Sequence, residues 1–385
     1  MTTNRRAVLG AIGLAPLATL SSAAMARAAR PADRVDAFLR ARMAAKAIPG
    51  AGLAVTRPGH PDKVAAYGLA SIELGVAATD RTVFPMASAS KMLAGFAAGK
   101  LAEMGRLDLD APARTYLPEL PATVAGVRVH HLLSHTSGLR GPGANPDFQA
   151  QQAKREGREA YVGPLRLDVF TDDEILRLGA AVAPAEAPGA RWRYNQFPYF
   201  LFGLIVARLS GRSYAEFVAE SLLRPLGIAG ALYGDHRTLV PGRNPTNYTR
   251  QFGPLQNYGL KYTPGYWPAA GLNISPAEAV KLLAAFRPGR LLREETLDRL
   301  WRRARLNDGS EANYGLGFTV TTSNGRTWVG HEGGGCCYFG WWPDRQLGLA
   351  ILLNLSGSHE DGIEAALAEL LLGGSAAAPA SSPAL

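Results

Sequence analysis

The chain has 385 residues, of which 47% are hydrophobic and 19% are charged, and its formal net charge is +9. This composition supports one large or two closely packed globular domains and excludes a chain that is disordered throughout. Without the N-terminal Arg5, Arg6 and Arg27 the net charge falls to +6, and the remaining arginines are dispersed, which argues against a nucleic-acid-binding protein.

Residues 1–28 are predicted to be an export signal. Arg5 and Arg6 precede an apolar run at Ala7–Leu20, and Ala26-Arg27-Ala28 offers small residues at the two positions that a signal peptidase reads. The run is too short for a permanent membrane anchor, and the paired arginines resemble a twin-arginine signal. We therefore expect a periplasmic or secreted mature chain that starts near Ala29. A cytoplasmic protein with a loose N-terminus is the alternative.

A helix and a strand pair are the first predicted elements after the signal. Their apolar positions are Val35, Phe38, Leu39 and Met43 for the helix, then Ala51–Thr56 and Val64–Ala70 for the strands. The middle of the chain is predicted to be mainly helical. Its helix signals are Lys91–Met104, the capping boxes Thr171-x-x-Glu174 and Ser213-x-x-Glu216, and a helix start at Ser275, Pro276 and Glu278.

Strand patterns return near the end of the chain, at Tyr314–Thr322, Thr327–His331 and Leu347–Asn354, before an apolar helix at Asp361–Leu372. Early and late strands must share a sheet to bury their apolar faces, so we expect a single catalytic domain at 29–373. Its α/β lobe takes about 29–85 and 265–373, and a helical lobe of about 86–264 is inserted. The cleft between the lobes is the natural place for a site. The Ala-, Ser- and Pro-rich residues 374–385 are predicted to be a disordered tail.

Two clusters of special residues follow the helical region. Arg302, Arg303 and Arg305 are expected on a solvated helix face. Cys336 and Cys337 are the only cysteines, and the Cα atoms of adjacent residues are about 3.8 Å apart, which is below the usual disulfide range. We therefore expect two buried thiols. No His/Cys spacing indicates a metal site, and no cofactor is expected.

The most informative short pattern is Ser-x-x-Lys, formed by Ser88 and Lys91. Residues three apart on a helix lie on one face, so the Lys91 amine can reach the Ser88 hydroxyl and make it an acylating nucleophile. Composition alone gives roughly 0.3 chance matches to this pattern. A buried serine and a solvated lysine on an ordinary helix remain the alternative unless other residues support the pair.

Two later segments supply that support. Tyr194 lies just before a predicted helix, where its phenol can enter the cleft. Gly330-His331-Glu332-Gly333-Gly334-Gly335 closes a predicted strand with glycines that let a substrate approach the backbone closely. The chain contains no Gly-x-Ser-x-Gly, which argues against the nucleophile elbow of an α/β-hydrolase.

The order, spacing and flanking residues of these elements resemble the serine β-lactamase, DD-peptidase and family VIII esterase superfamily, whose patterns are Ser-x-x-Lys, Tyr-x-Asn and Lys/His-x-Gly. The resemblance runs from about Val35 to Leu372 and includes the stretches His130–Leu139 and Ala269–Ser275. It implies a mostly antiparallel sheet flanked by helices, with an inserted mainly helical lobe, which is an α/β (α+β) fold of the β-lactamase/transpeptidase type.

The resemblance also implies catalytic roles. Ser88 is the expected nucleophile and Lys91 its activating partner. Tyr194 is the expected general base and proton donor to the leaving group, with a phenolate favoured by the Lys91 charge as one option. The backbone amides of Ser88 and Gly334 are the expected oxyanion hole, worth roughly 3 kcal/mol per donor. His331 takes the third-motif position. For each polar residue a satisfied core group is the alternative.

Three residues are expected to bind substrate, and two of them depart from the superfamily pattern. Gly333 matches the glycine of the third motif. Gln196 stands where Asn is usual, with Asn195 in the variable place, so the side chain that binds the substrate amide is longer by one methylene. Glu332 stands where many relatives have Thr, and a carboxylate there would repel a substrate carboxylate by on the order of 1 kcal/mol. Alternatively, Glu332 points away, because neighbours on a strand alternate faces.

Three functions are compatible with these residues. The first is an exported serine hydrolase that cleaves a small-molecule or peptide ester or amide through a Ser88 acyl-enzyme, as an esterase or D-amino-acid peptidase does. The second is a penicillin-sensitive DD-carboxypeptidase or class C-like β-lactamase, which the Lys/His-x-Gly form at His331 partly supports. The third is a non-catalytic penicillin-binding-like scaffold, which the altered Gln196 would suit. No nucleic-acid partner and no stable membrane anchor are expected, and the sequence leaves the oligomeric state open.

Overall fold

The computed structural model describes residues 33–157, 170–234, 244–251, 253–259, 263–323, 325–357 and 363–372. The predicted export signal at 1–28 and the predicted tail at 374–385 lie outside these residues. Both therefore stay predictions, as do the boundaries of the two lobes. Within the described residues, no helix combines the length and the apolar character needed to cross a membrane.

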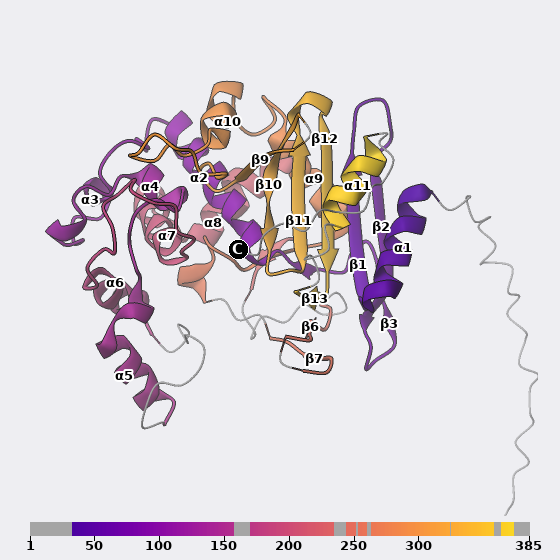
Figure 1. The fold of residues 1–385 in the computed structure, drawn as a ribbon, viewed down its shortest axis with the longest axis horizontal. Coiled ribbons are helices and arrows are strands. Elements are labelled where there is room, and N and C mark those ends of the chain that lie inside the picture. Colours follow the sequence, from indigo (N-terminus) through magenta and orange to yellow (C-terminus); the bar gives the residue numbers. More distant parts are fainter. Residues whose placement is uncertain are drawn as a thin grey trace, which may run out of the picture.

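An antiparallel sheet of seven strands joins the early and late parts of the chain (Figure 1). Its strand order is β3-β2-β1-β12-β11-β10-β9. The bounds are β1 (Gly50–Thr56), β2 (Lys63–Ser71), β3 (Val76–Ala77), β9 (Thr319–Ser323), β10 (Arg326–Gly333), β11 (Cys337–Trp342) and β12 (Leu347–Leu353). The pairing of β1 with β12 aligns Leu53 with Ile351. The expected sharing of one sheet by early and late strands is confirmed.

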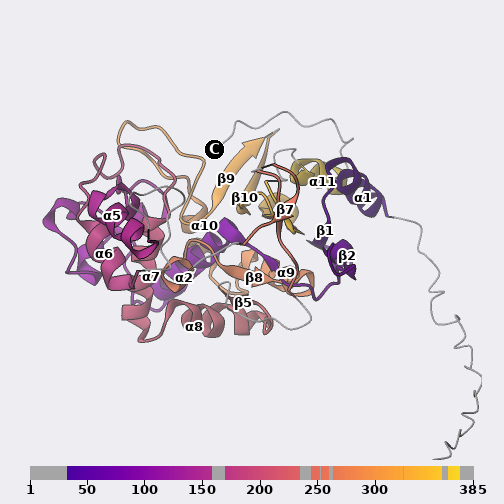
Figure 2. The ribbon, with the colours of Figure 1, turned by 90° about the horizontal axis from the view of Figure 1, so that it is seen from below.

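Helices cover both faces of this sheet (Figures 1 and 2). On one face, α1 (Arg34–Lys46) and α11 (Ile363–Leu371) bury Leu39 and Leu367 in a cluster with Leu53 and Leu349. On the other face, α9 (Pro276–Leu283) packs against β1 and β12. The result is a three-layer arrangement in which each apolar face of the sheet has its own core.

The remaining helices form a second lobe beside the β9 end of the sheet (Figure 1). They are α2 (Lys91–Glu103), α3 (Ala113–Tyr116), α4 (Val129–Leu133), α5 (Pro146–Arg155), α6 (Asp172–Ala180), α7 (Phe197–Ser210) and α8 (Tyr214–Val218), with α10 (Glu294–Trp301) packed against α2. Two further three-stranded sheets join distant segments: β4 (Phe84–Pro85), β8 (Leu272–Ile274) and β5 (Leu232–Tyr233), and β13 (Leu355–Ser356), β6 (Tyr248–Thr249) and β7 (Gln256–Asn257). The predicted fold class, an α/β (α+β) protein with an inserted mainly helical lobe, is confirmed.

The local signals in the sequence correspond to real elements. Both capping boxes form, since the Thr171 and Ser213 side chains accept hydrogen bonds from the backbone amides of Glu174 and Glu216. The predicted helices and strands around these signals lie within a few residues of the observed ones. The two cysteines are free buried thiols, as expected.

Three predictions of local structure were wrong or incomplete. Strand β11 was not predicted. The strand expected from Tyr314 begins only at Thr319, because Gly315–Gly317 turns back to pack against α10 and α2, and the amide of Leu316 donates to the carbonyl of Leu300. Arg302, Arg303 and Arg305 do not lie on a helix face, because α10 ends at Trp301.

Candidate active site

Ser88 lies in a tight 3₁₀ turn, Ala87–Ser90, that leads into α2. The turn is fixed on one side by β8, since the amide of Met86 donates to the carbonyl of Leu272 over 2.8 Å and the amide of Leu272 donates to the Ser90 hydroxyl over 3.1 Å. Ala87 has φ of 43°, in the left-handed region, which costs a non-glycine residue roughly 1–3 kcal/mol. This strained residue directly precedes Ser88, which is half-buried.

Lys91 is fully buried at the first position of α2, one helical turn after Ser88. Its Nζ donates a hydrogen bond of 2.8 Å to the carbonyl oxygen of Ala269. The same atom lies 4.7 Å from the centroid of the Tyr194 ring. Burial without a carboxylate partner lowers the pKa of Lys91 well below its ordinary value, because desolvation disfavours the charged form. The geometry therefore favours a neutral amine beside Ser88.

Tyr194 approaches Ser88 from the segment that precedes α7 (Phe197–Ser210), and a hydrogen bond joins the Tyr194 phenol and the Ser88 side chain. The residue as a whole is 40% exposed, yet its hydroxyl is surrounded by protein. Desolvation of this hydroxyl raises the pKa of Tyr194 to about 12, against a smaller lowering by the bond to Ser88. The pKa depends on the surroundings of the hydroxyl and not on the exposure of the whole residue, because the hydroxyl is the titrating group. The phenol is therefore protonated at neutral pH, and the phenolate considered from the sequence is disfavoured.

His331 lies near the end of β10 and is buried. Its Nε2 lies 2.8 Å from the Tyr314 hydroxyl, and its Nδ1 lies 2.5 Å from the carbonyl oxygen of Glu332. Desolvation, with a further contribution from Lys91, lowers the pKa of His331 to about 3. The ring is thus neutral, with Nδ1–H donating to the Glu332 carbonyl and Nε2 accepting from Tyr314. At this position of the site the protein offers no positive charge.

Two glycines bring the end of β10 against the turn that carries Ser88. A Cβ atom on Gly333 would collide with the carbonyl oxygen of Met86, and a Cβ atom on Gly334 would lie 3.4 Å from the Cβ of Ala87. Gly334 also has φ of 53°, in the left-handed region that favours glycine. This close approach places Gly334 against Ala87, the residue before Ser88, and its part in an oxyanion hole stays a prediction.

Gln196 and Glu332, the two residues that depart from the superfamily pattern, are placed differently. Gln196 is half-buried at the N-terminus of α7, and its contact with a substrate amide stays a prediction. The neighbouring Asn195 has a structural role, because its side-chain amide donates to the carbonyl of Leu139 over 2.6 Å and its Oδ1 accepts from the amide of Phe197 over 3.0 Å.

Glu332 does not join the site residues. Glu332 is paired with Tyr338 of β11, whose ring belongs to the core on the α1 and α11 face. His331 is paired with Phe339, which belongs to the core on the opposite face. Directly paired residues of antiparallel strands point to the same side of the sheet. Glu332 therefore points to the face of the sheet opposite His331, as the alternative considered from the sequence has it. The expected repulsion of a substrate carboxylate by this side chain has no basis in the structure.

Several residues that the sequence did not single out surround the site. The Tyr199 hydroxyl donates to the carbonyl of Leu133 over 2.6 Å and lies 3.3 Å from the Tyr314 hydroxyl. The ring of His135 lies 4.4 Å from that of Tyr194 and 4.8 Å from that of Tyr314. His135 belongs to the stretch His130–Leu139 noted above, which was the only signal in the sequence that could have drawn attention to it.

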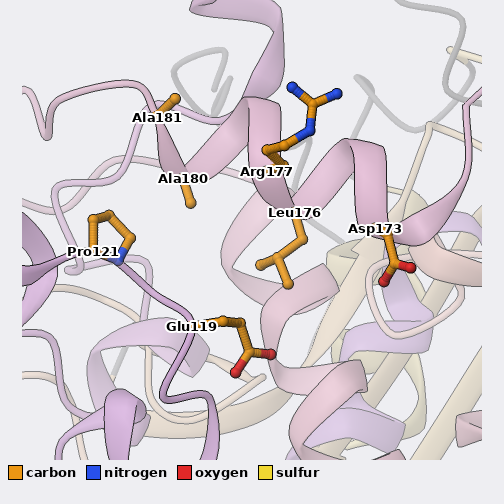
Figure 3. Close-up of a pocket in the computed structure, with 7 residues that line it drawn as sticks. All are labelled: Glu119, Pro121, Asp173, Leu176, Arg177, Ala180 and Ala181. Atoms are coloured by element: carbon orange, nitrogen blue, oxygen red, sulfur yellow. The ribbon is translucent and has the colours of Figure 1, made fainter.

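A separate hollow of about 360 Å³ lies in the helical lobe, between α6 and the segment that contains Glu119 and Pro121 (Figure 3). It is lined by Glu119, Pro121, Asp173, Leu176, Arg177, Ala180 and Ala181, none of which is a site residue. Glu119 is engaged with Arg208 in a bidentate ion pair. We therefore assign the chemistry to Ser88 and its neighbours, not to this hollow. The described residues contain no group of three or more His, Cys, Asp or Glu side chains that could hold a metal ion.

Comparisons with known proteins agree with this arrangement. Residues 35–374 match the family model described as Beta-lactamase. The chain is 29% identical over 372 residues to "Esterase EstB" of Burkholderia gladioli, an alignment that covers 86% of this chain and 92% of the esterase.

Two solved structures show how far the fold likeness extends. The octameric penicillin-binding protein homologue from Pyrococcus abyssi is 25% identical, with a TM-score of 0.73 over 88% of this chain and 77% of that one. The D-amino acid amidase from Ochrobactrum anthropi SV3 is 22% identical, with a TM-score of 0.70 over 89% of this chain and 98% of that one. At that identity the amidase supports the fold alone. The family match, the esterase and the penicillin-binding protein homologue together show that the chain belongs to the beta-lactamase family and is a serine hydrolase of the β-lactamase/DD-peptidase superfamily.

Proposed function

We propose that this protein hydrolyses small uncharged esters, and amides of similar shape, through an acyl-enzyme on Ser88. The observation that carries the proposal is that the buried amine of Lys91, three positions after Ser88, lies 4.7 Å from the ring centroid of Tyr194, whose phenol interacts with Ser88. Burial favours the neutral form of the amine and the protonated form of the phenol. An acylating serine needs a base for its own proton and an acid for the leaving group, and these two groups supply both.

The protonation states revise the roles that were expected of the two residues. Lys91 accepts the Ser88 proton as the Ser88 oxygen forms a bond to the substrate carbonyl carbon. The oxyanion that develops is held by the backbone amides of Ser88 and Gly334, each worth roughly 3 kcal/mol. When the carbon–oxygen or carbon–nitrogen bond breaks, the leaving group takes the Tyr194 proton, which is replaced by the proton held on Lys91. Water then attacks the acyl-enzyme with the same groups in reverse order.

The environments of Lys91 and His331 favour an uncharged substrate. Burial lowers the pKa of Lys91 well below its ordinary value and that of His331 to about 3, so a positive charge that would attract the carboxylate of penicillins and D-Ala-D-Ala peptides is disfavoured on both. The similarity to an esterase over most of both chains supports the same substrate class. Amides come second, because the structural neighbours include an enzyme named as a D-amino acid amidase. Export of the mature chain to the periplasm or medium remains part of the proposal and rests on residues 1–28 alone.

Two measurements test the proposal. After incubation with a fluorophosphonate, intact-mass spectrometry should show one adduct on the wild-type protein and none on Ser88→Ala. A panel of p-nitrophenyl esters, D-amino-acid amides and nitrocefin should then give the highest kcat/KM for a short acyl ester. A protein that forms no adduct would be a scaffold instead, and a kcat/KM for nitrocefin above that for the esters would favour the β-lactamase or DD-carboxypeptidase alternative.

A further inference from the structure

The segment Ser134–Leu139 lies alongside the segment that carries Tyr194, although neither is a regular strand. Three backbone hydrogen bonds of 2.8 Å each join them: Ala185 N to Gly138 O, Gly189 N to Thr136 O, and Arg193 N to His135 O. The side chain of Asn195 adds a bond to the carbonyl of Leu139 over 2.6 Å. The position of Tyr194 is therefore set by the first segment as well as by its own neighbours in the chain.

His135 accepts hydrogen bonds from the two residues that flank Tyr194. Its carbonyl oxygen accepts from the amide of Arg193 over 2.8 Å, and its Nδ1 accepts from the amide of Asn195 over 3.2 Å. The residues on both sides of Tyr194 are thus held by one histidine. The imidazole also packs against the Tyr194 ring, with 4.4 Å between the ring centroids and 39° between the planes.

The chemistry of the buried ring identifies the nitrogen that matters. His135 is 1% exposed, and burial, with contributions from Lys91 and His331, lowers its pKa well below the ordinary value. Because Nδ1 accepts a hydrogen bond, the proton of the neutral ring lies on Nε2. Nε2 is buried and has no hydrogen-bond partner among the described residues, which is unfavourable for a polar group. An apolar ring would fill the same space without that cost, so the distinctive contribution of this histidine is the acceptor at Nδ1.

The backbone of His135 is also specialised. Its φ of 60° lies in the left-handed region, which Asn, Asp and His adopt more readily than other non-glycine residues. This conformation lets one residue present both its carbonyl oxygen and its side chain to the Tyr194 segment.

We propose that His135 is a positioning residue that fixes the Tyr194 phenol over Ser88 by holding the backbone on both sides of Tyr194 and packing against its ring. This inference rests on the proposed function, because His135 acts through Tyr194 and not on the substrate. A hydroxyl that must deliver a proton to a leaving group is sensitive to its position, since a displacement of about 1 Å can cost roughly 100-fold in rate.

Two substitutions separate the contributions of the side chain. His135→Phe keeps an aromatic ring and removes the acceptor. His135→Asn keeps an acceptor at the same branch position and tolerates the left-handed backbone, but removes the ring. Each variant is assayed with a p-nitrophenyl ester, whose phenolate departs without protonation, and with the ethyl ester of the same acid, whose alkoxide needs the Tyr194 proton.

We expect His135→Phe to lower kcat/KM, which reports only the steps up to the acyl-enzyme, by roughly 10- to 100-fold for the ethyl ester, with a much smaller loss of kcat/KM for the p-nitrophenyl ester. Tyr194→Phe should show the same dependence on the leaving group. His135→Asn should recover part of the lost activity. The matched control is His131→Phe, because His131 also accepts a hydrogen bond from a backbone amide, that of Arg128 over 3.1 Å. Within the described part of the chain His131 has neither a ring contact nor a hydrogen bond with Tyr194, so this variant should behave as the wild type.

The double variant His135→Phe/Tyr194→Phe gives the decisive comparison. If His135 acts through the Tyr194 hydroxyl, the double variant is no slower than Tyr194→Phe alone. Equal losses for both leaving groups, or additive losses in the double variant, overturn the inference and indicate a general structural role. If His135→Phe does not fold, the same comparison with His135→Asn decides. Wild-type rates in Tyr194→Phe would overturn the proposed catalytic assignment itself, whereas a damaged Tyr194→Phe with an unimpaired His135→Phe would overturn only the positioning role.

Discussion

The amine of Lys91 donates a hydrogen bond of 2.8 Å to the carbonyl oxygen of Ala269. A neutral primary amine has two N–H groups and one lone pair, so this bond leaves the lone pair available to accept the Ser88 proton. An ammonium in the same place would have no lone pair and no carboxylate to compensate its charge. In the proposed mechanism, the desolvated environment of Lys91 is therefore what lets it act as a base.

Lys91→Arg should abolish this base function. Arginine cannot be deprotonated in proteins, so we expect kcat to fall by roughly 10²- to 10⁴-fold, measured with a p-nitrophenyl ester. Lys100→Arg is the matched control, because Lys100 lies on the same helix and is only half-buried. Activity of Lys91→Arg within a few-fold of the wild type would contradict the assignment.

Lys91 should also make stability depend on pH. In the folded protein its pKa lies well below 10.5, whereas the unfolded chain keeps the ordinary value. Between the two values the unfolded state binds one more proton, so the free energy of unfolding should rise with pH by up to about 1.4 kcal/mol per unit. The gain in stability from Lys91 is complete above the pKa that Lys91 has in the unfolded chain, and it is lost as the pH falls toward the lower pKa of the folded protein.

Urea denaturation of the wild type and of Lys91→Met at several values between pH 7 and pH 10 measures this effect. The wild type should gain stability relative to the variant as the pH rises, because only the wild type releases a proton on folding. Parallel curves for the two proteins would show that Lys91 stays charged in the folded state.

Gly333→Ala should disrupt the site from the β10 side. The added Cβ would collide with the carbonyl oxygen of Met86 and lie 3.2 Å from the amide nitrogen of Ala89, so the turn that carries Ser88 must move. We expect loss of esterase activity and a lower Tm. Gly126→Ala is the control, because its Cβ would lie at an ordinary 3.7 Å from the ring of Pro188. Full activity of Gly333→Ala would contradict the close approach of β10 to Ser88.

The two thiols should be inert in the native protein. Cys336 and Cys337 are each 2% exposed, and burial raises the pKa of Cys336 to about 12 and that of Cys337 well above its ordinary value. The thiolate is the reactive form, so an aromatic disulfide reagent should label neither residue in buffer and both in denaturant. Prompt labelling of one thiol in the native protein would contradict their burial.

Much of the scaffold could be predicted because its signals are local. The capping boxes at Thr171 and Ser213 satisfy helix amides within one turn, and the apolar spacing around Leu39 depends on one helix face. The Ser88 and Lys91 pair is local in the same sense, since the two residues lie three positions apart, in a 3₁₀ turn and at the start of the helix that follows it. In each case the interacting groups lie within a few positions of one another.

The features that could not be predicted depend on distant parts of the chain. All six residues of β11 are buried, so the strand lacks the alternation of polar and apolar residues by which half-buried strands are recognised. The low pKa of His331 depends on burial and on Lys91, its Nε2 contact depends on Tyr314, and the place of His135 depends on Asn195. The face chosen by Glu332 depends on its pairing with Tyr338. None of these relationships is visible from sequence spacing.

The contact between Gly333 and Met86 joins two segments that are made at very different times during synthesis. When the ribosome has completed the helical lobe, Ser88, Lys91 and Tyr194 already exist in the nascent chain, but β10 has not emerged. The cradle for the reacting carbonyl is completed only when that strand docks onto the turn. Under the proposed function, ester cleavage therefore cannot begin before β10 has been translated, and the protein stays catalytically silent until that strand has docked.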